Sequence, residues 1–81
     1  MANDMSIQAM ELSFTILEDI IMLKPLTNKK DLMAIANKAS ADANASNKYP
    51  EVVKMAYREM VKKLETLTFD DIKEIREIIE D

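Results

Sequence analysis

Apolar residues recur every three or four positions between Met10 and Leu23 and form the dominant apolar segment of the chain. At helical spacing they fall into two neighbouring stripes: Met10, Phe14, Leu17 and Ile21 in one, and Leu12, Ile16, Ile20 and Leu23 in the other. The polar residues of the segment share one narrow strip. A helix that is apolar over more than half of its circumference must be covered from several sides, so we predict that the other segments pack around it.

Capping residues and prolines divide the chain into four predicted helices, at about residues 5–23, 29–46, 50–65 and 69–80. Asn3 or Asp4 is placed to cap the first helix. This helix must end before Pro25, because proline lacks the backbone N–H that a helix interior needs. Thr27 or Asn28 is placed to cap the second helix.

The start of the fourth helix carries the clearest local signal. Thr68 precedes Asp71 by three residues, which is the spacing of a capping box with Asp in place of Glu. Leu67 and Ile72 occupy the positions of a hydrophobic staple. Pro50 suits the first turn of the third helix. The last two helices have apolar stripes of their own: Val53, Tyr57, Met60 and Leu64 in the third, and Phe69, Ile72, Ile75, Ile78 and Ile79 in the fourth.

The chain contains no glycine, so any position with a positive φ must use Asn or Asp. We therefore expect Asn44 or Asn47 to end the second helix in the left-handed conformation that glycine usually supplies. The lack of glycine also disfavours tight β-hairpins, P-loops and dinucleotide-binding folds. Short connectors between amphipathic helices instead predict an all-α fold: a single helical domain over residues 1–81, built as a compact bundle of four helices in an antiparallel or an orthogonal arrangement.

Composition and charge narrow the possible partners. The apolar content of 48% is ordinary for a globular chain, and the net charge of −4 disfavours nucleic acid or an anionic membrane as the main partner. Glu11, Glu18 and Asp19 interrupt the apolar segment, so it cannot span a bilayer, and no signal peptide opens the chain. We expect a cytoplasmic protein without membrane insertion, present as a monomer or a homodimer.

No pattern of residues points to catalysis or to a cofactor. The chain has neither His nor Cys. Asp70, Glu74, Glu77 and Asp81 form an acidic row along one helix, and such a row does not converge on a metal ion. Nothing in the sequence suggests a pocket in which two of these carboxyl groups would carry out acid–base work. We expect a non-enzymatic protein without a metal or a cofactor.

Charge is segregated along the chain, with net values of −4, +2, +2 and −4 in residues 1–23, 24–47, 48–65 and 66–81. One interpretation is that acidic and basic helices lie side by side within the fold. The other is that the basic residues form a docking face. Lys54, Arg58 and Lys62 are spaced by four on the third helix, so this row is either a solvated surface or a docking surface for an acidic partner.

Methionine is frequent, with seven residues in the chain. Its flexible side chain can fill irregular gaps in a core or line an adaptable binding surface. Met10 and Met60 fall on the apolar stripes, so we assign them to the core. Met22, Met33 and Met55 fall nearer the edges of their helices, which makes them candidates for a partner-binding groove.

The segment from Ile35 to Asp42 resembles the first helix and turn of a helix-turn-helix. Three departures weaken this interpretation: Ser40 stands where glycine is usual, Pro50 would cut the next helix within about two turns, and the chain is acidic. That second helix offers few groups to DNA: Asn44, Ser46, Asn47 and Lys48. A helix-turn-helix-like transcriptional regulator that binds DNA is the alternative function.

A second resemblance covers about residues 14–80. Leu17–Ile20, the helix around Leu32, Tyr49–Val53 and Leu67–Phe69 follow one another in an order that resembles small bacteriocin immunity proteins of the enterocin A and pediocin type. The resemblance implies a cytosolic antiparallel four-helix bundle, which protects the bacterial producer cell by acting on the membrane receptor of the bacteriocin. The residues and the resemblance together favour a protein that acts by binding another protein, as an immunity factor, inhibitor or adaptor.

Overall fold

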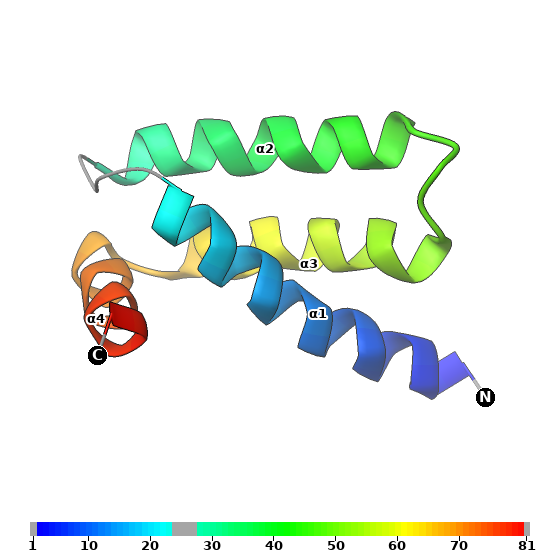
Figure 1. The fold of residues 1–81 in the computed structure, drawn as a ribbon, viewed down its shortest axis with the longest axis horizontal. Coiled ribbons are helices and arrows are strands. Elements are labelled where there is room, and N and C mark those ends of the chain that lie inside the picture. The colour runs from blue at the N-terminus through cyan, green and yellow to red at the C-terminus, as the bar shows by residue number, and fades with distance from the viewer. Residues whose placement is uncertain (1, 24–27, 81) are drawn as a thin grey trace.

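The computed structural model describes residues 2–23 and 28–80, which form four helices (Figure 1). These are α1 (Ala2–Leu23), α2 (Lys29–Ala45), α3 (Glu51–Thr66) and α4 (Phe69–Glu80). The predicted all-α class is confirmed, and the predicted ends of α2, α3 and α4 hold to within one residue. The cap predicted at Asn3 or Asp4 is wrong, because both residues belong to the helix whereas an N-cap has non-helical backbone angles.

The first three helices alternate in direction along the chain, and the fourth lies across the end of the first and third. α2 and α3 form an antiparallel hairpin, and α1 crosses α3 diagonally in the same general direction (Figure 1). α4 is seen almost along its axis in Figure 1, at the end of the molecule where α1 and α3 finish. α2 is therefore antiparallel to α1 and α3, as in the first predicted alternative. α4 instead crosses the ends of α1 and α3, as in the orthogonal alternative.

The most extensive contact between helices joins α1 and α3. Ala9 and Ser13 on α1 and Ala56 on α3 are completely buried. Their small side chains permit a close approach of the two backbones, and the distance between helix axes depends on such residues. The Ser13 hydroxyl donates a hydrogen bond to the Met10 carbonyl, which satisfies this buried polar group within its own helix.

The hydrophobic core lies where all four helices meet. Its buried residues are Leu17, Ile20 and Ile21 from α1, Leu32 and Ala36 from α2, Met60 and Leu64 from α3, and Ile72 from α4. The prediction that the other segments pack around α1 is confirmed for its second half, since α1 contacts each of the other three helices.

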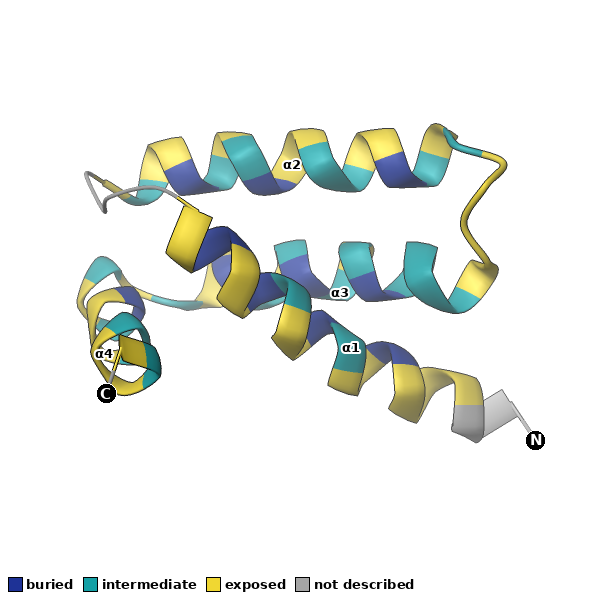
Figure 2. Ribbon diagram, in the orientation of Figure 1, coloured by how far each residue is buried: buried dark blue, intermediate teal, exposed yellow. Residues whose placement is uncertain are grey.

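The first half of α1 is less covered than the sequence predicts. Met10 is 51% exposed and Phe14 is 53% exposed, although both belong to a stripe assigned to the core. Figure 2 shows exposed positions along this part of α1, which projects away from α2. The physical reason is the short α4, which lies across the far end instead of alongside α1 and α3.

Side-chain caps start two of the helices as predicted. The backbone N–H of Asp71 donates to the Thr68 hydroxyl over 3.1 Å, and the N–H of Thr68 donates to an Asp71 carboxylate oxygen over 3.0 Å. The capping box of α4 is thereby confirmed. Asn28 caps α2, since its side-chain oxygen accepts from the Asp31 N–H over 2.8 Å. The other cap proposed for α2, Thr27, lies outside the described residues, as does Pro25.

The end of α2 differs from the prediction. None of the described residues has a positive φ, so neither Asn44 nor Asn47 adopts the left-handed conformation. The helix ends instead at Ser46 in an extended conformation, with φ −83° and ψ 140°. The chain can then reach α3 without a left-handed residue. Asn44 is held by its side-chain amide, which donates to the Ser40 carbonyl over 2.9 Å.

Candidate functional site

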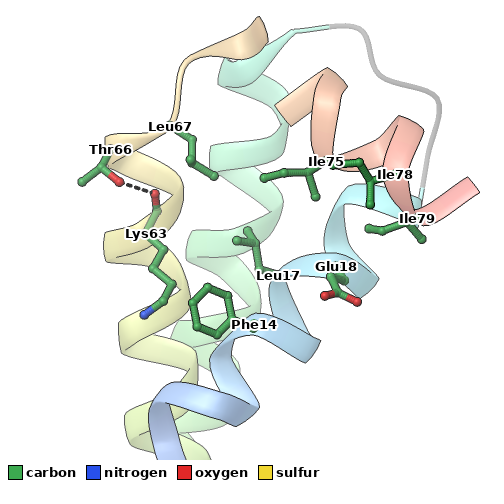
Figure 3. A pocket seen from close by; sticks show the side chains of 9 residues that line it. All are labelled: Phe14, Leu17, Glu18, Lys63, Thr66, Leu67, Ile75, Ile78 and Ile79. Carbon is green, nitrogen blue, oxygen red and sulfur yellow. Dashed lines mark hydrogen bonds between the residues drawn. The ribbon is translucent and has the colours of Figure 1, made fainter. Parts of the chain in front are cut away.

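A groove opens between α1, α3 and α4, on the side of the molecule away from α2. We call it the main groove; its volume is about 530 Å³, and the residues that line it are Phe14, Leu17, Glu18, Lys63, Thr66, Leu67, Ile75, Ile78 and Ile79. In Figure 3 Leu17 of α1 lies between the isoleucines of α4 and Phe14, whose ring lies beside the Lys63 side chain of α3. Three helices from distant parts of the sequence therefore supply one largely apolar wall.

The rim of the main groove is formed by large apolar side chains that face solvent. Ile78 is 72% exposed on α4 and Phe14 is 53% exposed on α1, whereas Leu17 between them is buried in the core. Burying an exposed Phe or Ile side chain contributes about 1.5–3 kcal/mol. Two such side chains around one cleft are the arrangement expected of anchors for a partner.

Lys63 lies on the rim beside Phe14. Its Nζ is 4.8 Å from the centroid of the Phe14 ring, a cation–π contact. The Lys63 carbonyl accepts a hydrogen bond from the Thr66 hydroxyl over 2.7 Å (Figure 3). No carboxylate among the described residues forms an ion pair with Lys63, so the aromatic ring is the partner of this cation.

A smaller hollow continues the main groove along the same side of α1 and α3. We call it the side hollow; its volume is about 190 Å³, and it is lined by Ser6, Ile7, Ala9, Met10, Met55 and Glu59. Ile7, Met10 and Phe14 follow at helical spacing, so they continue one exposed apolar line on α1. From Ile7 to Phe14 this line is about 10 Å long, at a rise of about 1.5 Å per residue.

Acidic residues dominate the helices on both sides of the main groove. α1 contains no Lys or Arg, and its Glu11 and Glu18 share a face with Phe14 because they lie three positions before and four after it. Glu74 lies four positions before Ile78 on α4. Within residues 2–23 and 28–80, none of these three glutamates takes part in an ion pair. The two basic residues of α4 are paired on their own helix, Lys73 with Asp70 over 3.6 Å and Arg76 with Glu80 over 2.9 Å.

The predicted basic row does not lie at the main groove. Arg58 forms an ion pair with Glu51 over 3.2 Å and also donates to the Asn44 side-chain oxygen. Lys62 pairs with Glu59 over 3.5 Å. Lys54 is only partly exposed, and its carbonyl accepts from Asn44. Two of the three cations thus form ion pairs within α3 itself, and neither of these pairs joins an acidic helix to a basic one.

The candidate methionines are dispersed over the molecule. Met33 packs against the core, and Met22 is exposed but lines neither hollow. Met55 lies in the side hollow together with Met10. The prediction that Met10 belongs to the core is wrong, because its side chain is exposed, whereas Met60 is completely buried as predicted. Phe14 and Ile78, which dominate the rim, also belong to apolar stripes predicted from the sequence, although the structure leaves both exposed.

The helix-turn-helix interpretation expects a turn near Ser40. α2 is continuous from Lys29 to Ala45, so the segment from Ile35 to Asp42 is an unbroken helix with Ser40 inside it. Of the polar groups offered to DNA, Asn44 belongs to that same helix and Ser46 ends it. The geometry of a separate recognition helix is therefore absent from this part of the chain.

Across the described residues, no three acidic residues come together in a way that could hold a metal ion. No helix in residues 2–23 or 28–80 is long and apolar enough to cross a membrane. Comparison with protein-family models, curated proteins and solved structures finds no match to this chain.

Proposed function

We propose that this chain is a non-enzymatic protein that acts by binding another protein through the main groove. One observation carries the proposal: Phe14 and Ile78 are exposed on two different helices at the rim of a single apolar groove, whose base is fixed to the core by Leu17. Isolated exposed apolar residues are normal on a protein surface, but a lined apolar cleft supports a binding role.

The energetics favour the main groove over the basic row as the main source of affinity. The ion pairs of Arg58 and Lys62 are solvent-exposed, and such pairs contribute about 0–1 kcal/mol each. A partner at the basic row would also have to compete with Glu51 and Glu59. A partner in the main groove gains by burying the apolar surface of Phe14 and Ile78, where the described residues form no ion pair that it would have to break.

A narrower form of the proposal follows from the resemblance to bacteriocin immunity proteins. In this form the chain works in the bacterial cytoplasm and its partner belongs to the receptor that a bacteriocin engages. Expression of the chain in a sensitive strain, followed by a bacteriocin challenge, tests it. Survival that depends on Ile78 supports the narrower form, and unchanged killing of cells that contain the folded chain contradicts it.

The general proposal is tested by capture with matched variants. Tagged wild type, Ile78→Ser and Leu23→Ser are incubated with lysate from the source cell, and retained proteins are identified by mass spectrometry. Leu23 is the control because it is 63% exposed on α1 but lines neither hollow. We expect a partner that wild type and Leu23→Ser retain and Ile78→Ser loses, and the purified partner should then bind directly with the same ranking. A partner retained equally by all three proteins would show that the main groove is not the binding site.

A further inference from the structure

We propose that the partner segment that occupies the main groove and the side hollow is a cationic amphipathic helix of another protein. This inference rests on the proposed function and adds the chemistry of the partner. Its apolar face would cover the line from Ile7 to Phe14 and the isoleucines of α4. Its Lys or Arg residues would lie on both flanks, beside the glutamates of α1 and α4.

The shape of the site suits a helix. In a regular four-helix bundle, a fourth helix would lie alongside α1 and α3, but here α4 crosses their end (Figure 1). The exposed line from Ile7 to Phe14 is about 10 Å long, which corresponds to about two turns of a bound helix. Such a helix presents anchors at positions i, i+3 or i+4, and i+7, the usual pattern for a helix bound in a groove.

The charge around the site selects a cationic partner. Glu11 and Glu18 border Phe14 on α1, and Glu74 borders Ile78 on α4. These carboxylates have no ion-pair partner in the described part of the chain, so a bound cation would not have to displace an internal one. Among residues 2–23 and 28–80, Lys63 is the one cation that lines the main groove, and it lies over the Phe14 ring.

The same charges oppose a second copy of this chain in the groove. In a symmetric dimer the same surface patch meets itself, so α1 would face α1. The acidic helix that lacks any Lys or Arg would then meet its own copy, and like charges brought together across an interface are costly. An anionic helix or an anionic membrane surface would meet the same repulsion.

The test uses two synthetic peptides of about 16 residues, long enough to form a helix and to span the site. Both carry the same Leu positions at helical spacing; the flanking residues are Lys in one peptide and Glu in the other. Binding to the full chain is measured by fluorescence anisotropy, and the contact surface is mapped by NMR shifts on isotope-labelled protein. We expect the Lys peptide to bind at least about tenfold more tightly than the Glu peptide, with an affinity that falls as salt is added.

Variants separate the contributions of shape and charge. Ile78→Ser should weaken the Lys peptide at least about tenfold, whereas the matched Leu23→Ser should not, since central anchors dominate binding. The double variant Glu18→Gln, Glu74→Gln should weaken it and Lys63→Gln should strengthen it, while Asp42→Asn, an exposed carboxylate of α2, serves as the neutral control. Circular dichroism of every variant establishes that the fold is intact.

Three results would overturn the inference. The first is equal or tighter binding of the Glu peptide in an Ile78-dependent manner, which contradicts the cationic partner and leaves the main groove as a binding site. The second is an Ile78-dependent dimer of the free chain in analytical ultracentrifugation, which assigns the groove to a second copy. The third is the absence of Ile78-dependent binding by either peptide, which excludes a helix as occupant. The proposed function itself is tested separately, by the capture of a partner from lysate.

Discussion

Thr68 and Asp71 cap the start of α4 reciprocally, each accepting a backbone hydrogen bond from the other through its side chain, over 3.1 and 3.0 Å. Two backbone N–H groups that would otherwise lack partners are satisfied in this way. Leu67, directly before this pair, packs against the core and also lines the main groove. The local cap therefore fixes the direction in which α4 leaves α3, and with it the position of Ile75 and Ile78.

The first prediction concerns this cap. Thr68→Ala removes the hydroxyl acceptor and should lower the free energy of unfolding by about 1 kcal/mol, within a usual range of roughly 0.5–2 kcal/mol. Ser46→Ala should have a much smaller effect, because its hydroxyl accepts only from the N–H of Lys48 at the end of α2. Urea denaturation of both variants measures the difference. Equal losses would contradict the assignment of Thr68 as the stronger cap.

The second prediction concerns nucleic acid. Because α2 is continuous through Ser40 and the chain has a net charge of −4, we expect no sequence-specific DNA binding. A gel shift against genomic fragments at physiological salt should show no retarded band. A band that survives an excess of competitor DNA would support the regulator interpretation despite the missing turn.

The third prediction concerns the basic row. Replacing Lys54, Arg58 and Lys62 together by Glu removes the ion pairs to Glu51 and Glu59 and places like charges there, at a cost of a few tenths of a kcal/mol for each pair. We expect circular dichroism to remain helical and binding to a captured partner to be unchanged. A folded triple variant that loses its partner would assign the docking surface to this row instead of the main groove.

Local signals were enough to predict the ends of most helices. The capping box at Thr68 and the cap at Asn28 depend on residues three positions apart, so they can be read without knowledge of the tertiary fold. The core positions of Leu17, Met60 and Ile72 follow from helical periodicity in the same way.

The site could not be predicted in this way, because periodicity identifies the apolar face of a helix but not the element that covers it. Met10, Phe14 and Ile78 have the same periodicity as buried residues, and only the crossed position of α4 leaves them exposed. The sequence did contain one indication: the first helix is apolar over more than half of its circumference, whereas the fourth helix has only 12 residues with which to cover it. The predicted left-handed conformation of Asn44 is wrong for a related reason. Its side-chain oxygen accepts a hydrogen bond from Arg58 of α3, and such a contact between helices cannot be read from the local sequence.

The fourth prediction separates the base of the main groove from its rim. Leu17 is 4% exposed, so Leu17→Ala should destabilise the fold by about 2–5 kcal/mol through lost burial and the cavity that remains. Phe14→Ala should cost clearly less, because half of the ring is already exposed and the contact with Lys63 contributes only about 0.5–1 kcal/mol. Chemical denaturation measures both, and a larger loss for Phe14→Ala would show that the ring is a structural residue.

The last prediction concerns the close contact of α1 and α3 that shapes the site. Ala56 is completely buried on α3, so Ala56→Leu must push the helices apart or distort side chains, at a typical cost of about 1–3 kcal/mol. Ala41→Leu is the matched control, because Ala41 is exposed on α2 and Leu is nearly as good a helix former as Ala. Thermal denaturation should show a lower midpoint for Ala56→Leu and almost no change for Ala41→Leu. Because Phe14 and Lys63 lie on the two helices that would separate, NMR shifts of their side chains should change in Ala56→Leu alone. An Ala56→Leu protein with unchanged stability and unchanged shifts would mean that the contact has room for a larger side chain, and the close packing inferred from Ala9, Ser13 and Ala56 would be wrong.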